Sequence, residues 1–449
     1  MLVAGSVISR RRPPIPVGPW LVVGLRRSGA AAARALWARG EAVVCVDSGR
    51  PPEAEALRAL GMEVWTGVDG RVELNRARAV VKSPGVPREA PVIAEARRRG
   101  VSVYGELELG WRLVERPFVA VTGTNGKTTT AELLGAIWRA AGRPVDVAGN
   151  VGLAVSTLAA DRSPDPDAAV ICEASSFQLE DTVAFAPDVA LILNVQPDHL
   201  DRHGTMEDYL GAKLRIFARQ GPDDVAIGPP ELLAQAGGEG RRVTFGPHWD
   251  VDLALRDGLL TWQGADLMRV SDVRIRGAHN LENAMGAAAA ALSAGIEPDA
   301  VAEGLRSFPG VEHRIEDVAD IDGVLWVNDS KATNVASTSV ALDAFAEPVH
   351  LILGGQGKGQ DFAPLRDPVA IHVRTAYLIG EDAGAIAAAL GDATELVRSG
   401  DLEGAVAAAR AAAEPGEVVL LSPACASFDQ YPGGYEERGM HFKALVGSG

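Results

Sequence analysis

Short apolar runs, many of them rich in β-branched residues, alternate along the chain with longer alanine-rich stretches. The runs lie at 21–23, 42–46, 118–121, 169–172, 189–193, 324–327, 351–353 and 418–421. The alanine-rich stretches include 30–38, 284–292 and 405–413, and they carry larger apolar residues at helical spacing. Because alanine is the strongest helix former and short strands that alternate with helices form βαβ units, the pattern predicts an α/β fold with parallel sheets.

The length of the chain predicts more than one domain. A single hydrophobic core rarely grows beyond about 250–300 residues, whereas the chain has 449. Two or three domains are therefore expected. We place the boundaries near Gly105 and Gly310, which gives domains at 1–105, 106–310 and 311–449.

The N-terminal segment, at 1–17, is expected to be a disordered leader. Its apolar residues precede its arginines, which is the reverse of the order in a signal peptide, and Pro13, Pro14 and Pro16 disfavour regular structure. No apolar run elsewhere approaches the roughly 20 residues that a membrane-spanning helix needs. We therefore expect no membrane insertion.

Charge and cysteine content narrow the classes of function. The formal net charge of −16 argues against a nucleic-acid-binding protein and against adsorption on an anionic membrane. Cys45, Cys172 and Cys425 are odd in number and form no Cys-x-x-Cys pair. A disulfide framework and a zinc ribbon are both disfavoured, and a cytoplasmic location fits.

Polar and glycine-rich segments directly follow most of the predicted strands. They lie at 24–29, 122–129, 173, 194, 328–331, 354–358 and 422–427. In open α/β sheets, ligands bind at the carboxyl ends of the strands. The sequence therefore predicts a site to which several domains contribute.

The segment from Thr122 to Thr129 reads Thr-Gly-Thr-Asn-Gly-Lys-Thr-Thr and lies between a predicted strand and a predicted helix. Glycines and a helix N-terminus present backbone N–H groups to phosphate, Lys127 adds a full positive charge, and the Thr128 hydroxyl can ligate magnesium. Val121 stands where the strict phosphate-loop pattern has glycine. A chance Gly-Lys-Thr in a loop is the alternative, which the strand–loop–helix context disfavours.

Three further positions carry candidate chemistry. Glu173 ends the next strong strand, where a carboxylate can hold the magnesium that Thr128 also contacts; taken alone it would be a surface glutamate. Asp198, His199, Asp201 and His203 look like metal ligands without the spacing of a zinc site, so we favour a solvated loop with one functional histidine, His199. By sequence alone, Lys213 is a surface lysine on a predicted helix at 206–217.

Seven motifs, in preserved order, resemble the Mur ligases, which form amide bonds on UDP-linked peptidoglycan precursors. They lie at 122–129, 173–180, 194–202, 279–283, 313–314, 328–334 and 354–358. Within the family, the segments 83–85, 422–430 and 435–439 are similar to the member that adds D-glutamate to UDP-N-acetylmuramoyl-L-alanine. The resemblance covers the chain from Trp20 to the C-terminus.

The resemblance implies three domains and an ATP-dependent reaction through an acyl phosphate. The first domain is Rossmann-like and binds the UDP end of the substrate, the central domain is a P-loop mononucleotide-binding domain, and the third is Rossmann-like and binds the amino acid. ATP and Mg²⁺ are the implied cofactors, UDP-N-acetylmuramoyl-L-alanine and D-glutamate the implied partners, and a monomer is expected.

Roles for single residues also follow from the resemblance. Nucleotide binding is implied for Gly123, Thr124, Asn125, Gly126, Lys127, Thr128, Thr129, Asn280, Asn283, Arg314 and Asp329. Magnesium ligation is implied for Thr128, Glu173, His199 and a carbamylated Lys213, and catalysis for Lys127, His199 and Lys213. The UDP-sugar would contact Ser28, Asp47, Ser83, Gly85, Asn150 and Gln178. Glutamate would contact Lys331, Thr333, Lys358, Ser427 and Tyr435.

One departure and several alternatives stay open. Arg26 stands where a G-x-G-x-x-G pattern has its second glycine, which disfavours a dehydrogenase; Arg26 or Arg27 contacts the diphosphate or is simply exposed. A folylpolyglutamate-type ligase and a non-catalytic nucleotide-binding regulator are the competing functions. The general base is not assigned, and His199 qualifies only if it is not fully engaged as a metal ligand.

Overall fold

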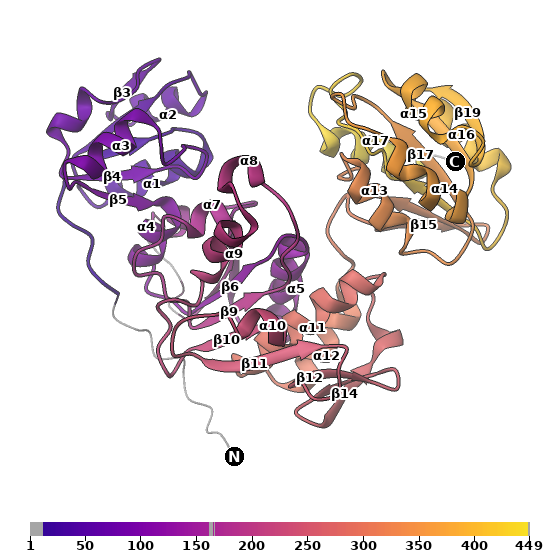
Figure 1. The fold of residues 1–449 in the computed structure, drawn as a ribbon, viewed down its shortest axis with the longest axis horizontal. Coiled ribbons are helices and arrows are strands. Elements are labelled where there is room, and N and C mark those ends of the chain that lie inside the picture. The colour runs from indigo at the N-terminus through magenta and orange to yellow at the C-terminus, as the bar shows by residue number, and fades with distance from the viewer. Residues whose placement is uncertain (1–11, 161–164, 166, 448–449) are drawn as a thin grey trace. The chain divides into compact units, whose positions relative to one another are not determined.

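The computed structural model describes residues 12–447 except 161–164 and 166. The chain divides into two compact units, Met1–Val273 with Glu282–Ser307 and Arg274–Leu281 with Phe308–Gly449. The described helices include none that combines the length and the apolar character needed to cross a membrane. Three separate sheets organise the molecule (Figure 1), and the predicted α/β fold is confirmed.

The N-terminal sheet is five-stranded and entirely parallel, in the order β3-β2-β1-β4-β5. Its strands are β1 (Trp20–Val23), β2 (Val43–Asp47), β3 (Glu63–Thr66), β4 (Ala79–Lys82) and β5 (Ser102–Gly105). The helices of this part are α1 (Arg27–Ala38), α2 (Glu53–Ala59), α3 (Pro91–Arg98) and α4 (Glu106–Leu113). Apolar side chains from the strands form a core cluster on each face of the sheet, as a doubly covered parallel sheet requires.

The central sheet has nine strands in the order β14-β13-β12-β11-β10-β9-β6-β8-β7. Its parallel strands include β6 (Phe118–Thr122), β7 (Val145–Gly149), β8 (Ala169–Glu173), β9 (Val189–Ile192), β10 (Val225–Gly228) and β11 (Arg241–Gly246). A meander of β12 (Leu253–Arg256), β13 (Leu259–Trp262) and β14 (Ala265–Arg269) extends one edge. The helices are α5 (Lys127–Ala140), α6 (Val155–Ala159), α7 (Ser176–Leu179), α8 (Leu200–His203), α9 (Met206–Leu214), α10 (Pro230–Leu233), α11 (Ala278–Ser293) and α12 (Pro298–Ser307).

The C-terminal sheet has six strands in the order β15-β16-β20-β17-β18-β19, and only β15 is antiparallel. The strands are β15 (Glu316–Ile321), β16 (Val324–Asn328), β17 (Val349–Gly354), β18 (Val373–Ile379), β19 (Glu395–Gly400) and β20 (Val418–Leu421). The helices are α13 (Val335–Leu342), α14 (Arg366–His372), α15 (Ala383–Leu390), α16 (Leu402–Ala412) and α17 (Tyr435–Gly447). The three-domain α/β architecture is thus confirmed, while the exact boundaries at 105 and 310 stay predictions.

The predicted disordered leader is wrong from Arg12 onward; the preceding part, 1–11, lies outside the described residues. Arg12 is buried, and its guanidinium donates hydrogen bonds to the carbonyl oxygens of Trp111, Val114 and Arg116. It also lies over the rings of Trp111 and Phe118, with its Cζ 4.8 and 4.7 Å from their centroids. The guanidinium therefore satisfies the carbonyls at the end of α4 and fixes the chain there.

Each of the three cysteines is buried in a different sheet region. Cys45 lies in β2, Cys172 in β8 and Cys425 just after β20, and all three are free thiols. Burial raises the pKa of Cys45 and of Cys425 to about 12 and raises the pKa of Cys172 as well. These thiols serve as small apolar core residues.

Candidate active site

The loop from Gly123 to Gly126 joins β6 to α5 with a backbone that requires glycine. Gly126 has a φ of 83°, and a Cβ there would lie 1.9 Å from the Asn283 side-chain oxygen. The predicted nucleotide residue Asn283 thus lies directly against the loop. The helix begins at Lys127, so its unpaired N–H groups face the loop and favour an anion there.

Two lysines converge on the backbone of this loop. Lys127 Nζ donates to the Gly123 and Thr124 carbonyl oxygens at 2.9 and 2.8 Å. Lys213 Nζ, on α9, donates to the same Gly123 oxygen at 2.6 Å, and its side chain is 1% exposed. The surface-lysine interpretation of Lys213 is therefore wrong. Burial, together with the positive charge of Lys127, lowers the pKa of Lys213 to about 7.

A carboxylate at the end of the neighbouring strand completes the central site. Glu173 Oε2 accepts a hydrogen bond from Thr128 Oγ1 at 2.9 Å, and Oε1 accepts one from Asn150 Nδ2 at 3.1 Å. Glu173 is 3% exposed, so it is not the surface glutamate that its position alone suggested. Two predicted magnesium ligands and the predicted substrate residue Asn150 therefore meet at this strand end.

Thr124 and Asn125 of the loop are held by neighbouring segments. Thr124 Oγ1 lies 3.2 Å from Tyr209 Oη, and Asn125 N donates to Asn194 Oδ1 at 3.0 Å. Thr129 is buried in the first turn of α5. The segment after β9 and the helix α9 therefore fix the shape of the phosphate loop.

His199 lies at the start of α8 in the left-handed backbone region, with a φ of 53°. Its ring centroid is 4.9 Å from that of Phe177 and 6.5 Å from that of Tyr209, whose ring also lies 4.4 Å from Lys213 Nζ. His199 Nε2 lies 3.4 Å from an Asp198 carboxylate oxygen. Tyr209 thus connects His199 to the lysine side of the phosphate loop.

In the segment after Asp198, the described side chain of His203 is held by other residues. His203 stacks on Phe177 and its Nε2 lies 3.0 Å from Ser176 Oγ. In the part of the chain that the structure describes, no three His, Cys, Asp or Glu side chains are grouped to hold a metal ion.

The predicted UDP-sugar residues of the N-terminal part gather at the carboxyl ends of β1, β2 and β4. The Asp47 carboxylate accepts from the backbone N–H groups of Leu25 and Gly49 at 2.6 and 2.7 Å. A pocket of about 360 Å³ lies beside it, lined by Arg26, Asp47, Gly49, Arg50, Pro51, Pro52 and Glu53. Ser28 is half-buried in the first turn of α1.

Arg26 and Arg27 are both exposed but lie differently. Arg26 lines the pocket, whereas Arg27 Nη2 reaches the Asn150 carbonyl oxygen at 3.5 Å. Gly24 has a φ of 83°, and a Cβ at Gly29 would lie 1.7 Å from the Gly24 carbonyl oxygen. The first and last glycines of the loop are therefore sterically required, even though Arg26 replaces the middle one.

A buried ion pair and a half-buried one, both missed by sequence reasoning, hold the loop with Ser83 and Gly85. Lys82 Nζ lies 2.5 Å from Asp181 Oδ2, with both side chains buried. Arg202 donates from Nη1 to the Pro84 carbonyl oxygen at 3.1 Å and from Nη2 to Glu180 at 2.6 Å. The sequence signal for this network was Lys82, a lysine at the end of an apolar strand, because a lysine is almost never fully buried unless it is paired.

Gln178 has an evident local role. It is 2% exposed, and its side-chain oxygen accepts hydrogen bonds from Ser175 N and Ser175 Oγ, both at 3.0 Å. Ser175 Oγ in turn accepts from Gln178 N at 3.3 Å. This reciprocal capping box begins α7. It fixes the segment that directly follows Glu173.

The C-terminal unit carries Asp329 at the end of β16. Its carboxylate accepts from Ser422 Oγ at 2.7 Å and from Ile315 N at 3.2 Å. Burial raises the pKa of Asp329 to about 7, although the Ser422 hydrogen bond and the charge of Arg314 act in the opposite direction. Arg314 lies between two residues with positive φ, His313 and Ile315. In this unit Asn280 Nδ2 donates to the Arg276 carbonyl oxygen at 2.7 Å.

Most of the predicted glutamate residues surround one pocket, which we call the amino-acid pocket. It has a volume of about 480 Å³ and is lined by Thr333, Gln356, Gly357, Lys358, Gly359, Gln360, Ala426, Phe428 and Tyr435. Lys331 Nζ lies 5.6 Å from the Tyr435 ring centroid, and Lys358 Nζ lies 5.4 Å from that of Phe428. Ser427 is next to the lining, and its buried hydroxyl has no partner among the described residues.

A phosphate loop beside a buried carboxylate, in a sheet flanked in sequence by two further α/β domains, defines a nucleotide-using α/β enzyme. Three family models match the chain: the Mur ligase MurD-like N-terminal domain at 19–105, the Mur ligase middle domain at 121–291, and the Mur ligase glutamate ligase domain at 313–425. The chain belongs to the Mur ligase family, and it is an ATP-dependent ligase.

Curated relatives match over nearly the whole chain. A UDP-N-acetylmuramoylalanine–D-glutamate ligase from Anaeromyxobacter dehalogenans is 46% identical over 449 residues, covering 95% of this chain and 96% of the relative. The enzyme of the same name from Acidobacterium capsulatum is 43% identical over 443 residues, covering 95% of each chain.

Solved structures show the same fold at lower identity. The MurC ligase of Thermotoga maritima has a TM-score of 0.59 at 20% identity, over 96% of this chain and 99% of that one. The MurF ligase of Thermotoga maritima, solved in complex with ADP, has a TM-score of 0.60 at 17% identity, over 90% and 95%. These structures support the three-domain fold.

Proposed function

We propose that the chain joins D-glutamate to the carboxylate of UDP-N-acetylmuramoyl-L-alanine through an acyl phosphate, with release of ADP and phosphate. The reaction would serve peptidoglycan precursor synthesis in the cytoplasm, with the enzyme a monomer. The observation that carries this proposal is the meeting of Lys127, Lys213, Thr128 and Glu173 around one phosphate loop. The name shared by relatives that are 39–46% identical supports the choice of substrates.

The chemistry explains why ATP is needed. A carboxylate does not acylate an amine at neutral pH, because oxide is a very poor leaving group. Transfer of the γ-phosphoryl group makes the leaving group phosphate. This transfer requires mainly positioning and neutralisation of charge, which the helix N-terminus of α5 and the Lys127 ammonium supply. The glutamate amine then attacks the acyl carbon, and the C–O bond to phosphate breaks as the amide forms.

The residues around Glu173 fit magnesium. Mg²⁺ prefers oxygen ligands, and the Thr128 hydroxyl and Glu173 carboxylate already lie 2.9 Å apart. Bound Mg²⁺ would neutralise phosphate charge. His199 is a further candidate ligand. Lys213 suits carbamylation because only a neutral amine reacts with carbon dioxide, and burial lowers its pKa to about 7. The modified side chain would present a carboxylate in place of an ammonium.

The amino-acid pocket suits a ligand with two carboxylates. Lys358 lines the pocket and Lys331 lies over the ring of Tyr435, which lines it too. Both can make charge-assisted hydrogen bonds to carboxylates, and the Ser427 hydroxyl has no partner among the described residues. The edge with Asp47, Ser83 and the pocket beside Arg26 is the proposed site for the UDP end of the other substrate.

Phosphate release tests the proposal. The purified protein, with ATP and Mg²⁺, is expected to release phosphate only when UDP-N-acetylmuramoyl-L-alanine and D-glutamate are both present. L-glutamate is the stereochemical control, and a folate with glutamate tests the folylpolyglutamate-type reaction. Phosphate release with a folate and glutamate, but not with UDP-N-acetylmuramoyl-L-alanine and D-glutamate, would replace the proposed function by the folylpolyglutamate-type reaction. ATP binding without any substrate-dependent release would favour the non-catalytic regulator.

A further inference from the structure

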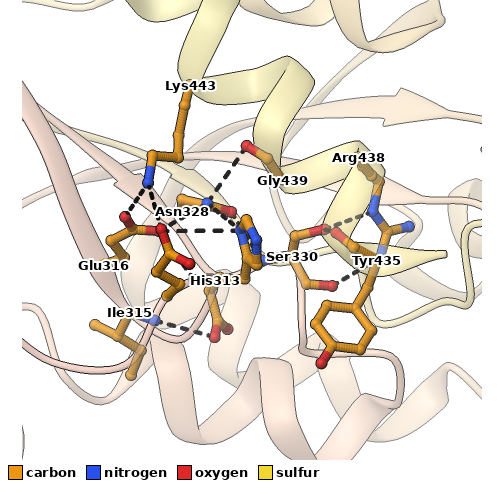
Figure 2. A network of polar contacts seen from close by, with 11 residues as sticks. His313, Ile315, Glu316, Asn328, Ser330, Tyr435, Arg438, Gly439 and Lys443 are labelled. Carbon is orange, nitrogen blue, oxygen red and sulfur yellow. Dashed lines mark hydrogen bonds and ion pairs between the residues drawn. The ribbon is translucent and has the colours of Figure 1, made fainter. Parts of the chain in front are cut away.

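A buried arginine on α17 bonds to the segments that follow two strands of the C-terminal sheet. Arg438 is 1% exposed; its Nε donates to Ser330 Oγ at 3.0 Å and its Nη2 donates to the Ser330 carbonyl oxygen at 2.8 Å. The same Nη2 donates to the Cys425 carbonyl oxygen at 3.1 Å. Ser330 follows β16 and Cys425 follows β20. Figure 2 shows the guanidinium beside Ser330 and Tyr435.

The segment after a third strand packs against the same guanidinium. Gly355 directly follows β17 and has a φ of 132°. A Cβ there would lie 2.4 Å from the Ala426 carbonyl oxygen and 3.3 Å from Arg438 Nη1. That Nη1 atom is buried and has no hydrogen-bond partner within the described part of the chain. The three segments therefore meet around one planar group.

Each segment carries a residue proposed for the amino-acid pocket a few positions further on. Lys331 follows Ser330, Ser427 follows Cys425, and Lys358 follows Gly355. The fourth residue, Tyr435, is tied in through its backbone, because Ser330 Oγ donates to the Tyr435 carbonyl oxygen at 2.8 Å. The relative placement of the ligand-binding groups thus depends on the loops that Arg438 connects.

We propose that Arg438 is the positioning residue of the amino-acid pocket, holding the loops after β16, β17 and β20 in the arrangement that places Lys331, Lys358 and Ser427 around one ligand. The inference rests on the proposed function. A planar guanidinium presents donors in fixed directions, whereas a lysine ammonium is a single point that cannot bond two loops with the same geometry. Without the guanidinium, the pocket residues would still be present but would no longer be held in the same positions.

Steady-state kinetics of Arg438→Lys and Ser330→Ala test this role. Arg438→Lys is expected to raise the KM for the amino acid about tenfold or more, with the KM for ATP and for the UDP-substrate within about twofold of wild type. Ser330→Ala, which removes one bond to the guanidinium and the bond to Tyr435, is expected to raise the same KM by about threefold. Ser330→Ala retains the buried arginine, so it gives an answer even if Arg438→Lys folds poorly.

Lys443→Met is the matched control. Lys443 also lies on α17, and its Nζ bonds to the carboxylates of Glu312 and Glu316, at 3.4 and 2.5 Å, rather than directly to Ser330, Gly355 or Cys425 (Figure 2). Lys443→Met should leave the amino-acid KM unchanged. An amino-acid KM equal to wild type in folded Arg438→Lys and in Ser330→Ala, or all three KM values raised alike, would overturn the proposal.

The wild-type assay separates this proposal from the proposed function. Whichever amino acid supports phosphate release in wild type is the one whose KM is measured in the variants. A wrong assignment of D-glutamate therefore leaves the Arg438 comparison intact. If the wild-type protein releases no phosphate with any amino acid, the pocket does not bind an amino-acid substrate. That result would contradict both the proposed function and the proposed role of Arg438, and it differs from a wild-type enzyme whose amino-acid KM is unchanged in the variants.

Discussion

The phosphate-loop site and the amino-acid pocket handle charge in opposite ways. In the first, Lys213 and Glu173 are buried and bonded to the loop or its helix. In the second, Lys358 is exposed and Lys331 half-buried, and each lies over an aromatic ring, while the buried Arg438 organises the backbone beneath them. The first arrangement suits a fixed phosphate and metal; the second leaves cations accessible to a ligand that enters from solvent.

The largest effect is expected at the phosphate loop. Lys127→Ala removes the full charge of the loop and should lower the rate of phosphate release by about a thousandfold, the scale for losing a preorganised group that stabilises developing charge. Activity within tenfold of wild type would mean that the charge of Lys127 is not needed to hold the phosphate. Circular dichroism of the same preparation checks that the variant is folded.

Glu173→Gln tests the metal assignment of the first site. The amide cannot supply the anionic oxygen that magnesium prefers, so the Mg²⁺ concentration for half-maximal activity should rise by at least about tenfold. Titration of activity with Mg²⁺ at saturating ATP measures the change. An unaltered Mg²⁺ requirement would assign Glu173 to the support of Thr128 and Asn150 only.

Lys358→Met tests the accessible cation of the second site. It should raise the KM for glutamate about tenfold while the KM for ATP stays constant, because one charge-assisted hydrogen bond is lost. Lys358→Arg is the matched variant, since it keeps the charge. If the ATP KM rises in parallel, Lys358 does not belong to a separate amino-acid pocket.

The smallest effects, on the free energy of unfolding, should have opposite signs at Lys213 of the phosphate-loop site and at Asp329 of the C-terminal unit. The pKa of Lys213 is lowered from 10.5 to about 7, so between these values the unfolded chain binds a proton that the folded protein does not, and stability at this group rises with pH. The pKa of Asp329 is raised from 3.8 to about 7, so its contribution falls as pH rises through that range.

Melting temperatures at several pH values, in buffer depleted of carbon dioxide, measure both contributions. In wild type, Lys213 should make the melting temperature rise with pH above pH 7, and Asp329 should make it fall between pH 4 and 7. Lys213→Met should lack the first pH dependence, and Asp329→Asn should lack the second. Shifts of about 2–4 °C per kcal/mol are expected for domains of this size. Parallel pH profiles in wild type and variants would contradict the buried charge states.

The phosphate loop and the strand exits could be predicted because their signals are local. Glycine spacing, Lys127 and the apolar run before Thr122 lie within a few residues of each other, and the predicted helix at 206–217 corresponds to α9, which ends at Leu214. The ends of the apolar runs also locate Glu173, Asp329 and Gly354 at the carboxyl ends of strands, and this prediction needs no knowledge of contacts between distant parts of the chain.

The burial of Lys213 and the buried Lys82–Asp181 ion pair could not be predicted. Lys213 becomes buried because α9 packs its last turn against a loop 90 residues earlier in the chain. Lys82 and Asp181 are distant in sequence, and nothing local marks them as partners. Arg12 lies in a proline-rich segment typical of disorder, yet the carbonyls at the end of α4 provide its partners. Long-range pairing, rather than composition, decides these positions.

The three buried thiols provide one reporter for each domain. Alkylating reagents attack the thiolate, and a pKa of about 12 for Cys45 and Cys425 leaves almost none at neutral pH. In the folded enzyme, labelling therefore requires local opening of the surrounding core. Mass spectrometry of the modified cysteines after partial denaturation would reveal the order in which the three domains unfold, and no cysteine would have to be introduced by mutation.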